Sequence, residues 1–122
     1  MPESKIRILL VDDHPQLLNF IRLGLKLKGY EVVTAVSGHN ALEAVRSNSL
    51  DIMLLDIRLP DIDGFQVLRE LRKFSALPVI AYSATPEYND WAVKSGADFF
   101  MAKPFDMDQL VEKISQLTNH MG

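Results

Sequence analysis

Polar side chains of three chemical kinds directly follow short apolar runs at four places in this sequence. The runs stop at a pair of aspartates, at a third aspartate, at a serine and at a lysine: Asp12 and Asp13, Asp56, Ser83, and Lys103. Carboxylate oxygens are the ligands that Mg²⁺ prefers, whereas a hydroxyl and an ammonium group bind phosphoryl oxygens. If these side chains converge, they predict a site for a divalent cation and a phosphoryl group.

Charge balance supports this prediction. Three ionised carboxylates in one pocket repel one another and raise one another's pKa values unless a cation holds them ionised. A bound Mg²⁺ and the ammonium group of Lys103 together bring the formal charge of the three aspartates to zero. The pocket can then accept a phosphoryl dianion, which one carboxylate can attack as a nucleophile. We therefore predict phosphoryl transfer with Mg²⁺ as the cofactor.

Strand-like and helix-like segments alternate along the chain and must position these residues. The expected strands are 5–11, 30–35, 51–56, a run that begins at Pro78, and 98–102; the expected helices are 15–28, 38–48, a run that begins after Gly64 with Phe65, Leu68 and Leu71 buried, 86–96, and a last helix with Leu110, Ile114 and Leu117 inside. This alternation favours a parallel sheet. We predict a single α/β domain over residues 1–122, with a core at about 5–117 and fraying at 119–122.

The second expected strand identifies the strand order. It runs through Val32 and Val33 into Ser37 without a charged residue at its end. This is expected if it lies on the far side of the first strand, away from the site. The predicted fold is a doubly wound (βα)5 domain of flavodoxin-like type, with a sheet in the order 2-1-3-4-5. Its ligand cleft would open at the carboxyl ends of the first and third strands, where the winding reverses.

The composition narrows the functional classes. The chain has 122 residues, of which 48% are apolar and 24% charged, and its formal net charge is -3. This acidic balance argues against direct binding of nucleic acid, and the absence of cysteine excludes disulfides and thiolate metal sites. No apolar run reaches the length of a membrane span or of a signal-peptide core. We therefore expect a cytoplasmic protein that does not contact membranes.

At the residues that carry the predicted chemistry, the sequence resembles the response regulator receiver domain of two-component signalling. The resemblance covers residues 5–117, and within the family the sequence is similar to chemotaxis regulators. It rests on four motifs: the acidic pair Asp12 and Asp13, the segment 54–64 around Asp56, Ser83 with Ala84, and Lys103 with Pro104 and Phe105. The family reading makes the chain a phosphoacceptor in a phosphorelay.

The resemblance implies a role for each site residue. Asp56 would be the phosphoacceptor, Asp13 and Asp56 would ligate Mg²⁺ together with the Arg58 carbonyl, and Asp12 would act largely through water. Lys103, the Ser83 hydroxyl and the Ala84 N–H would contact the phosphoryl group. The Lys103–Pro104 peptide bond would be cis, a state accessible essentially only before proline.

The resemblance also implies a switch. In receivers the hydroxyl after strand four moves toward the phosphoryl group, and an aromatic residue on strand five turns inward; here these are Ser83 and Phe100. The readout surface would be the fourth helix, the fifth strand and the fifth helix. The segment 86–96 has a poor apolar stripe, with Tyr88 and Trp91 among polar neighbours. Such a weakly anchored helix can be shifted by a few new hydrogen bonds.

The same resemblance implies the partners of the domain and the residues that control the lifetime of its phosphorylated form. The phosphodonor would be a sensor histidine kinase or a histidine phosphotransfer protein, and the target a downstream protein or output domain; a phosphorylation-dependent homodimer is compatible with it. Arg58 and Thr85 occupy the two positions that govern access of hydrolytic water in the family. We hypothesise that Arg58 shields the acyl phosphate.

Alternatives remain for single residues and for the whole chain. An isolated aspartate, serine or lysine at such places is more often a turn former, a helix cap or a solvated residue. His14 could indicate zinc, but His39 and His120 lie in other elements, so it is interpreted as a loop residue.

One rival function is a Mg²⁺-dependent aspartyl phosphohydrolase, which would need a general acid that Arg58 cannot supply. The other is a pseudo-receiver that binds partners without phosphorylation. We predict no enzyme activity on a separate substrate, only catalysis of the domain's own phosphorylation and dephosphorylation.

Overall fold

Strands and helices alternate along the chain, as the sequence predicts. The computed structural model describes residues 5–119. The elements, in chain order, are β1 (Arg7–Val11), α1 (Pro15–Leu27), β2 (Glu31–Ala35), α2 (Gly38–Ser47), β3 (Ile52–Asp56), α3 (Gly64–Arg72), β4 (Val79–Ser83), η1 (Pro86–Tyr88), α4 (Asn89–Ser95), β5 (Phe99–Ala102) and α5 (Met107–Asn119). Observed strand starts differ from the expected ones by one or two residues, and the fraying expected at 119–122 falls mainly outside the described residues.

The five strands form one parallel sheet in the order β2-β1-β3-β4-β5. This confirms the predicted order. The register pairs Val11 with Ala35 on one side and with Leu55 on the other, so β1 lies between β2 and β3. The next strands continue outward, with Asp56 opposite Tyr82 and Ser83 opposite Ala102. The carboxyl ends of β1, β3, β4 and β5 therefore meet at one edge.

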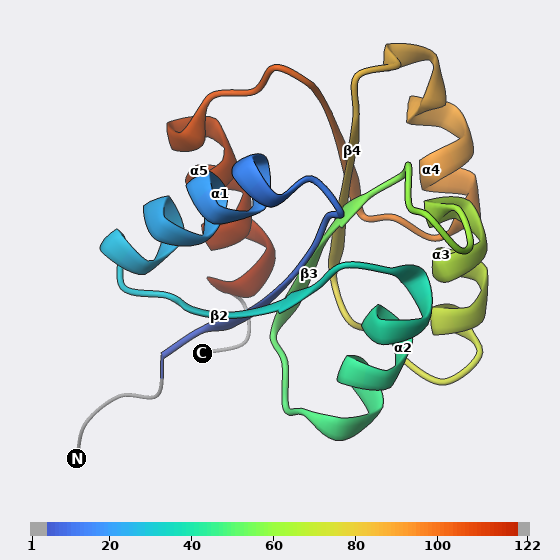
Figure 1. Ribbon diagram of the computed structural model, residues 1–122, viewed down its shortest axis with the longest axis horizontal. Coiled ribbons are helices and arrows are strands. Elements are labelled where there is room, and N and C mark those ends of the chain that lie inside the picture. Colours follow the sequence, from blue (N-terminus) through green and yellow to red (C-terminus); the bar gives the residue numbers. More distant parts are fainter. Residues whose placement is uncertain (1–4, 120–122) are drawn as a thin grey trace.

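Helices cover both faces of the sheet. Figure 1 shows α1 and α5 together on one side and α2, α3 and α4 on the other. Each face carries its own buried apolar cluster: Ile8, Leu10, Leu54 and Ile80 point toward α1 and α5, whereas their neighbours along the strands point toward α2, α3 and α4. The central strands β3 and β4 are buried along their whole length. Burial on both faces explains why these strands read as continuous apolar runs rather than alternating ones.

Local signals in the sequence place the helix ends. Pro15 occupies the first turn of α1, and Gly29, with φ +94°, follows its end, where residues other than glycine are strained. Ser37 caps α2 by accepting a hydrogen bond from the Asn40 N–H at 3.1 Å. Asp63 caps α3 in the same way, accepting from the Gln66 N–H at 2.9 Å. These caps satisfy backbone donors that would otherwise lack a partner at a helix start.

Two buried stripes differ in detail from the prediction. On α3, Val67 is fully buried beside Leu68 and Leu71, and Phe65 is only partly buried against the same cluster. On α5, Thr118 is buried with Leu110 and Ile114, whereas Leu117 packs with part of its side chain exposed. The Thr118 hydroxyl donates to the Ile114 carbonyl at 2.8 Å, and this hydrogen bond is what permits its burial.

The segment predicted as one helix from 86 to 96 is divided. Its first part is the 3₁₀ turn η1, and only Asn89–Ser95 is α-helical. Neither Thr85 nor Tyr88 makes a side-chain capping hydrogen bond, so no cap fixes an α-helical start at Pro86. Ala92 is the buried residue of α4. Its short length and small buried face agree with the predicted weak anchoring, whereas the Arg72 guanidinium of α3, which donates to the Gly96 carbonyl at 3.0 and 2.7 Å, holds the end of the helix in place.

Within residues 5–119, no helix has the length and apolar character that crossing a membrane would require.

Candidate functional site

Three carboxylates from two neighbouring strands converge at the carboxyl edge of the sheet. Asp12 directly follows β1 and Asp56 ends β3, and both side chains are buried, whereas about a third of the Asp13 side chain is exposed. One oxygen from each carboxylate and one nitrogen of His14 all lie within 4.8 Å of one another. The structure therefore brings together the three aspartates that the sequence singled out.

Asp56 is the most constrained of the three. Its Oδ1 atom accepts a hydrogen bond from the Arg58 N–H at 3.1 Å, whereas its buried Oδ2 atom has no hydrogen-bond partner among the described residues. Burial raises the pKa of Asp56, the Asp12 charge adds to this effect, and the hydrogen bond from Arg58 and the charge of Lys103 oppose it. A buried oxygen left without a partner is costly in folding free energy, so its retention is typical of a functional site.

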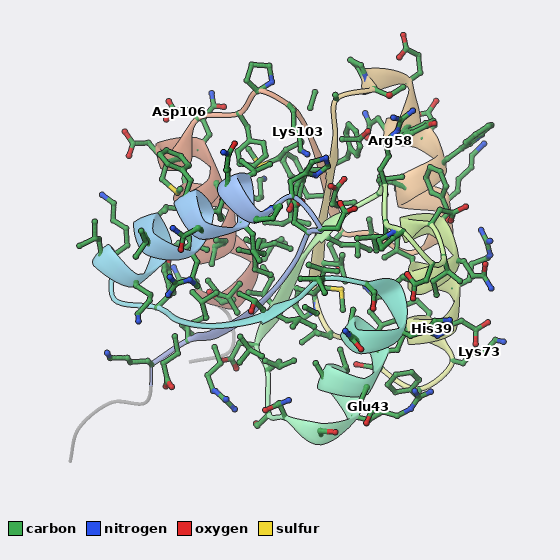
Figure 2. All side chains as sticks on the ribbon, viewed as in Figure 1. His39, Glu43, Arg58, Lys73, Lys103 and Asp106 are labelled. Carbon is green, nitrogen blue, oxygen red and sulfur yellow. The ribbon has the colours of Figure 1, made fainter. Side chains whose placement is uncertain are left out.

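Lys103 supplies the positive charge that the sequence predicts. It follows β5, and its Nζ atom is 3.5 Å from Asp56 Oδ2 and 4.0 Å from Asp12 Oδ2. Figure 2 shows Lys103 and Arg58 at the same end of the sheet, on loops that leave β5 and β3. The Lys103–Pro104 peptide bond is cis, as the resemblance implies. Most of the Lys103 side chain is buried, which strengthens its electrostatic interaction with the carboxylates.

Tyr82 is a site residue that the sequence analysis did not identify. Its hydroxyl donates to Asp12 Oδ2 at 2.7 Å, and its ring lies 5.0 Å from Lys103 Nζ. Burial, with the Asp12 charge and this hydrogen bond, raises the pKa of Tyr82 well above its ordinary value, so the hydroxyl stays protonated and can donate. The only signal in the sequence was a polar tip within an otherwise apolar strand, and a buried tyrosine hydroxyl usually has a partner.

A backbone hydrogen bond joins Ser83, the last residue of β4, to Lys103. Ser83 is buried, its Oγ atom accepts from the Thr85 N–H at 3.1 Å, and its carbonyl accepts from the Lys103 N–H at 2.8 Å. Ala84 and Lys103 border an apolar groove of about 490 Å³ beside the site; its other lining residues are Leu17, Phe20, Ile21, Pro104, Phe105 and Met107. The end of β4, Lys103 and this groove thus lie next to one another.

The loop that follows Asp56 is fixed at both ends. The Gly64 N–H donates to the Ile57 carbonyl at 2.7 Å, and a Cβ atom at Gly64 would lie 2.7 Å from Ile57 Cα, so a larger residue would force these backbones apart. Asp61 accepts hydrogen bonds from the Gly38 and His39 N–H groups at 2.8 and 2.9 Å. The loop with the Arg58 carbonyl is thereby attached to the start of α2.

His14 lies in the loop between β1 and α1, as the sequence predicts, but its ring faces the carboxylates. Its Nδ1 atom is 3.0 Å from Asp12 Oδ1. Its backbone N–H also donates to Asp12 Oδ1, at 2.8 Å. Sequence alone does not show this orientation, because it depends on how the Asp12 side chain turns back toward the following residue.

The donor set fits a hard divalent cation. Asp12, Asp13 and Asp56 provide carboxylate oxygens, and the unpartnered Asp56 Oδ2 atom faces the positive charge of Lys103 from within the same pocket. Oxygen ligands on a partly open pocket, with room for retained water, match the preference of Mg²⁺. The three carboxylates are thus close enough together to require a cation that keeps them ionised, as the sequence predicts.

Comparison with known proteins identifies the family. The model of the response regulator receiver domain matches residues 8–115. The chain belongs to this family. Its sheet order and its acidic pocket are those of a receiver domain of two-component response regulators, which is a signalling domain.

Curated relatives of this receiver domain include transcriptional regulators. The transcriptional regulatory protein KdpE of Mycobacterium tuberculosis is 39% identical over 109 residues, which cover 88% of this chain and 48% of that protein. Response regulator ArlR of Staphylococcus saprophyticus is 36% identical over 110 residues, covering 88% of this chain and 50% of that protein. The chain thus spans about half the length of these curated relatives.

Solved receiver structures share the whole fold. A response regulator receiver domain from Francisella has a TM-score of 0.91 and 30% identity, covering 97% of this chain and 100% of that one. The response regulator TrrA of Thermotoga maritima, in complex with Mg²⁺ and BeF, has a TM-score of 0.85 and 35% identity over 92% of this chain and 98% of that one. The receiver domain of a Pseudomonas aeruginosa sensor histidine kinase, with magnesium in its active-site cleft, has a TM-score of 0.88 and 28% identity over 95% and 99%.

Proposed function

We propose that this receiver domain accepts a phosphoryl group on Asp56, with Mg²⁺ as cofactor, from a sensor histidine kinase or a histidine phosphotransfer protein. The observation that supports this most is the state of Asp56 Oδ2, which is buried, lacks a hydrogen bond and lies 3.5 Å from Lys103 Nζ. A carboxylate oxygen that accepts no hydrogen bond keeps a lone pair available for attack on phosphorus, and a neighbouring cation can stabilise the charge that arrives with the phosphoryl group.

The proposed transfer balances in bonds and charge. Asp56 Oδ2 attacks phosphorus, an O–P bond forms, and the bond from phosphorus to the imidazole nitrogen of the donor breaks with its electron pair left on that nitrogen. Lys103 stabilises the added negative charge, and the Ser83 hydroxyl and the Ala84 N–H donate to the phosphoryl oxygens. A bound Mg²⁺ would neutralise charge on the same oxygens. The product is an acyl phosphate, so the domain acts on itself and on no separate substrate.

The same proposal assigns the metal ligands. Asp13, Asp56 and the Arg58 carbonyl would bind Mg²⁺ directly, and Asp12 would act through water. The Tyr82 hydroxyl and the His14 N–H hold Asp12 in place by hydrogen bonds to its two oxygens. The loop that carries Arg58 is held by Asp61 and by the contact of Gly64 with Ile57. These contacts hold the side chain of Asp12 and the loop of Arg58 in place.

The output surface is proposed to be α4, β5 and α5, through which the domain reaches a downstream protein or output domain. Ser83 would turn toward the phosphoryl group, and Phe100 on β5 would fill the space it leaves. Phe100 is partly buried against the cluster beneath α2, α3 and α4, and α4 presents a small buried face. A new hydrogen bond at Ser83 can therefore bias a short helix with a small buried face.

The phosphodonor is proposed to approach along the apolar groove beside Lys103, because this groove borders the residues that meet the phosphoryl group. Arg58 and Thr85, each two residues beyond a site residue, are proposed to govern access of hydrolytic water. Their backbone N–H groups donate to Asp56 and to Ser83, respectively, which places both residues next to the site.

Intact mass spectrometry after incubation with acetyl phosphate and Mg²⁺ tests the proposal. The wild type should gain one phosphoryl group, which hydroxylamine removes because it cleaves acyl phosphates, and Asp56→Ala should gain none. Asp90→Ala, which removes an exposed carboxylate of α4, is the matched control and should behave as the wild type. Equal gains in the wild type and Asp56→Ala would remove Asp56 from this role.

Faster decay of the phosphorylated species in Arg58→Ala is expected if Arg58 shields the acyl phosphate; an unchanged decay rate would contradict that role.

Turnover of a generic phosphomonoester in the same assay would instead favour a phosphohydrolase, and failure to take up phosphate would favour a pseudo-receiver.

A further inference from the structure

The His14 ring makes contacts that the proposed phosphoryl transfer does not use. Its Nδ1 atom lies near three carboxylates, at 3.0 Å from Asp12 Oδ1, 3.3 Å from Asp13 Oδ1 and 3.8 Å from Asp56 Oδ2. A ring nitrogen carries at most one hydrogen, so one hydrogen bond to Asp12 accounts only for the shortest of these approaches. The nitrogen occupies a position that faces all three oxygen donors at once.

The spacing of these atoms matches ligands around a single ion. An octahedral ion with bonds of about 2.1 Å separates neighbouring ligands by about 3.0 Å and opposite ligands by about 4.2 Å. The three separations from Nδ1 fall between these limits. An ion among them would meet Nδ1 after only small shifts of the side chains.

A second observation points to a ligand at the same place. Asp56 Oδ2 is buried, with 2% of the Asp56 side chain exposed, and it has no hydrogen-bond partner among the described residues. It is the same oxygen that lies 3.8 Å from His14 Nδ1. An acidic cluster alone is common without a metal, but Asp56 Oδ2 makes no hydrogen bond and has Lys103 Nζ, at 3.5 Å, as its nearest cation, so this buried oxygen can still accept a further positive ion or donor.

The surrounding contacts hold the ring in this position. The Tyr82 hydroxyl fixes one oxygen of Asp12 at 2.7 Å, and the His14 N–H fixes the other at 2.8 Å. Pro15 follows His14 and restricts its backbone to extended conformations, as its ψ of 106° shows. With the hydrogen on Nε2, which water can reach because the His14 side chain is 61% exposed, the Nδ1 lone pair is free to bind a metal.

We propose that His14 Nδ1 is a ligand of the ion in the acidic pocket, which gives the site a mixed nitrogen and oxygen donor set and raises its affinity for Co²⁺ and Ni²⁺ relative to Mg²⁺. The inference rests on the proposed function, because it concerns the same ion site. Mg²⁺ takes oxygen ligands and keeps its waters, whereas an imidazole nitrogen adds affinity for ions such as Co²⁺ and Ni²⁺. His14 therefore has a larger effect on the affinity of the site for Co²⁺ and Ni²⁺ than on its affinity for Mg²⁺.

Isothermal titration calorimetry of the full chain with the chloride salts of Co²⁺, Ni²⁺ and Mg²⁺ tests this. Loss of a group that merely orients a ligand costs about 10-fold to 100-fold in metal affinity, so His14→Ala should weaken Co²⁺ and Ni²⁺ binding by at least about tenfold. Mg²⁺ affinity should stay within about twofold, because imidazole adds little to its binding. His39→Ala is the matched control: its ring is 72% exposed and lies beside Asp61 rather than in the pocket. It should leave all three affinities unchanged.

Pulsed electron paramagnetic resonance of bound Mn²⁺ adds a direct signature. The wild type and His39→Ala should show ¹⁴N modulation from a coordinated imidazole, and His14→Ala should lose it. Unchanged Co²⁺ affinity in His14→Ala, or an equal loss in His39→Ala, would overturn the inference while Mg²⁺ binding upheld the proposed function. A wild type that binds neither Mg²⁺ nor Co²⁺ would overturn both. Because His14 is largely exposed, its variant should fold, which circular dichroism verifies.

Discussion

Among single residues, Asp56 carries the largest conflict between stability and function. Its carboxylate is buried beside the carboxylate of Asp12, and one of its oxygens lacks a hydrogen bond, while Lys103 is the nearest cation at 3.5 Å. Leaving a buried polar atom without a partner costs about 1–3 kcal/mol. The folded protein therefore keeps a buried carboxylate that is unfavourable for stability at Asp56. Binding of a metal ion or attachment of a phosphoryl group there would reduce this cost.

Asp56→Asn should raise the free energy of unfolding in the absence of metal by about 1–3 kcal/mol, because it removes the buried charge and supplies an amide that can donate to Asp12. Urea denaturation in a metal-free buffer measures this difference. Saturating Mg²⁺ should stabilise the wild type and leave the variant nearly unchanged, since binding to the native state alone adds stability. A variant that is less stable than the wild type without metal would show that the Asp56 carboxylate is satisfied by its surroundings.

At the same scale, residue type and position predicted the three aspartates, Ser83 and Lys103, because each stands at the end of a strand whose direction is fixed by the fold. Tyr82 and His14 were not predicted as site residues. Tyr82 meets Asp12 across a separation of 70 residues, and this contact requires the sheet order and the length of the tyrosine side chain together. His14 turns toward the pocket through a local backbone geometry that a sequence pattern does not contain.

Between elements, Asp61 connects the loop after β3 with the start of α2. It accepts hydrogen bonds from two backbone N–H groups of α2, and its Oδ2 atom lies 3.7 Å from His39 Nε2. Desolvation alone would raise the pKa of Asp61, but the hydrogen bonds from the His39 and Gly38 N–H groups outweigh it and lower the pKa to about 2. A Cβ atom at Gly38 would clash with Ile62 Cγ1, so the loop and helix also pack tightly here.

The contribution of Asp61 to stability should therefore depend on pH. A carboxylate with a lowered pKa in the folded state stabilises the protein above its unfolded pKa of about 3.8, and this stabilisation is lost as the pH falls toward 2. Asp61→Ala should cost about 1 kcal/mol at pH 7, as the loss of a helix cap does, and progressively less between pH 4 and 2. Urea denaturation across this range gives the difference.

Asp90→Ala provides the control, because Asp90 is exposed and makes no hydrogen bond among the described side chains. If the difference between the wild type and Asp61→Ala stayed constant from pH 7 to pH 2, the ionised form of Asp61 would not be what holds α2.

The arrangement of elements was largely predictable, and the reason is physical. Buried parallel strands are recognisable as apolar runs, and the second strand lacked the terminal charge of the others, which placed it away from the site. The exception was the segment 86–96. Its composition is compatible with a helix, but Pro86, an uncapped start and a small buried face leave the backbone free to form the 3₁₀ turn η1 before α4. Tertiary contacts, and not local propensity, decide where such a helix begins.

Across the whole molecule, aromatic rings form several of the contacts between the segment of η1 and α4 and its neighbour α3. Trp91 on α4 is 61% exposed, and its ring lies 5.7 Å from that of Phe65 on α3 in an edge-to-face arrangement. Tyr88 stacks on Trp91 at 6.1 Å. Each aromatic pair contributes about 0.5–1.5 kcal/mol beyond its buried area, which is no more than the roughly 1.5–3 kcal/mol of one hydrogen bond to a charged group. New hydrogen bonds to a phosphoryl group can therefore move α4 relative to α3.

Trp91 is the only tryptophan of the chain, so its fluorescence reports on α4 alone. Acetyl phosphate with Mg²⁺ should shift its emission to longer wavelength, because movement of α4 away from Phe65 exposes the indole to water. The shift should follow the same time course as the mass gain and be absent in Asp56→Ala. Phe65→Leu, which removes the aromatic partner, should show the longer wavelength before phosphorylation and a smaller change after it. A wild type that gains the phosphoryl mass without any change in Trp91 emission would mean that α4 does not move, and that the domain signals through another surface.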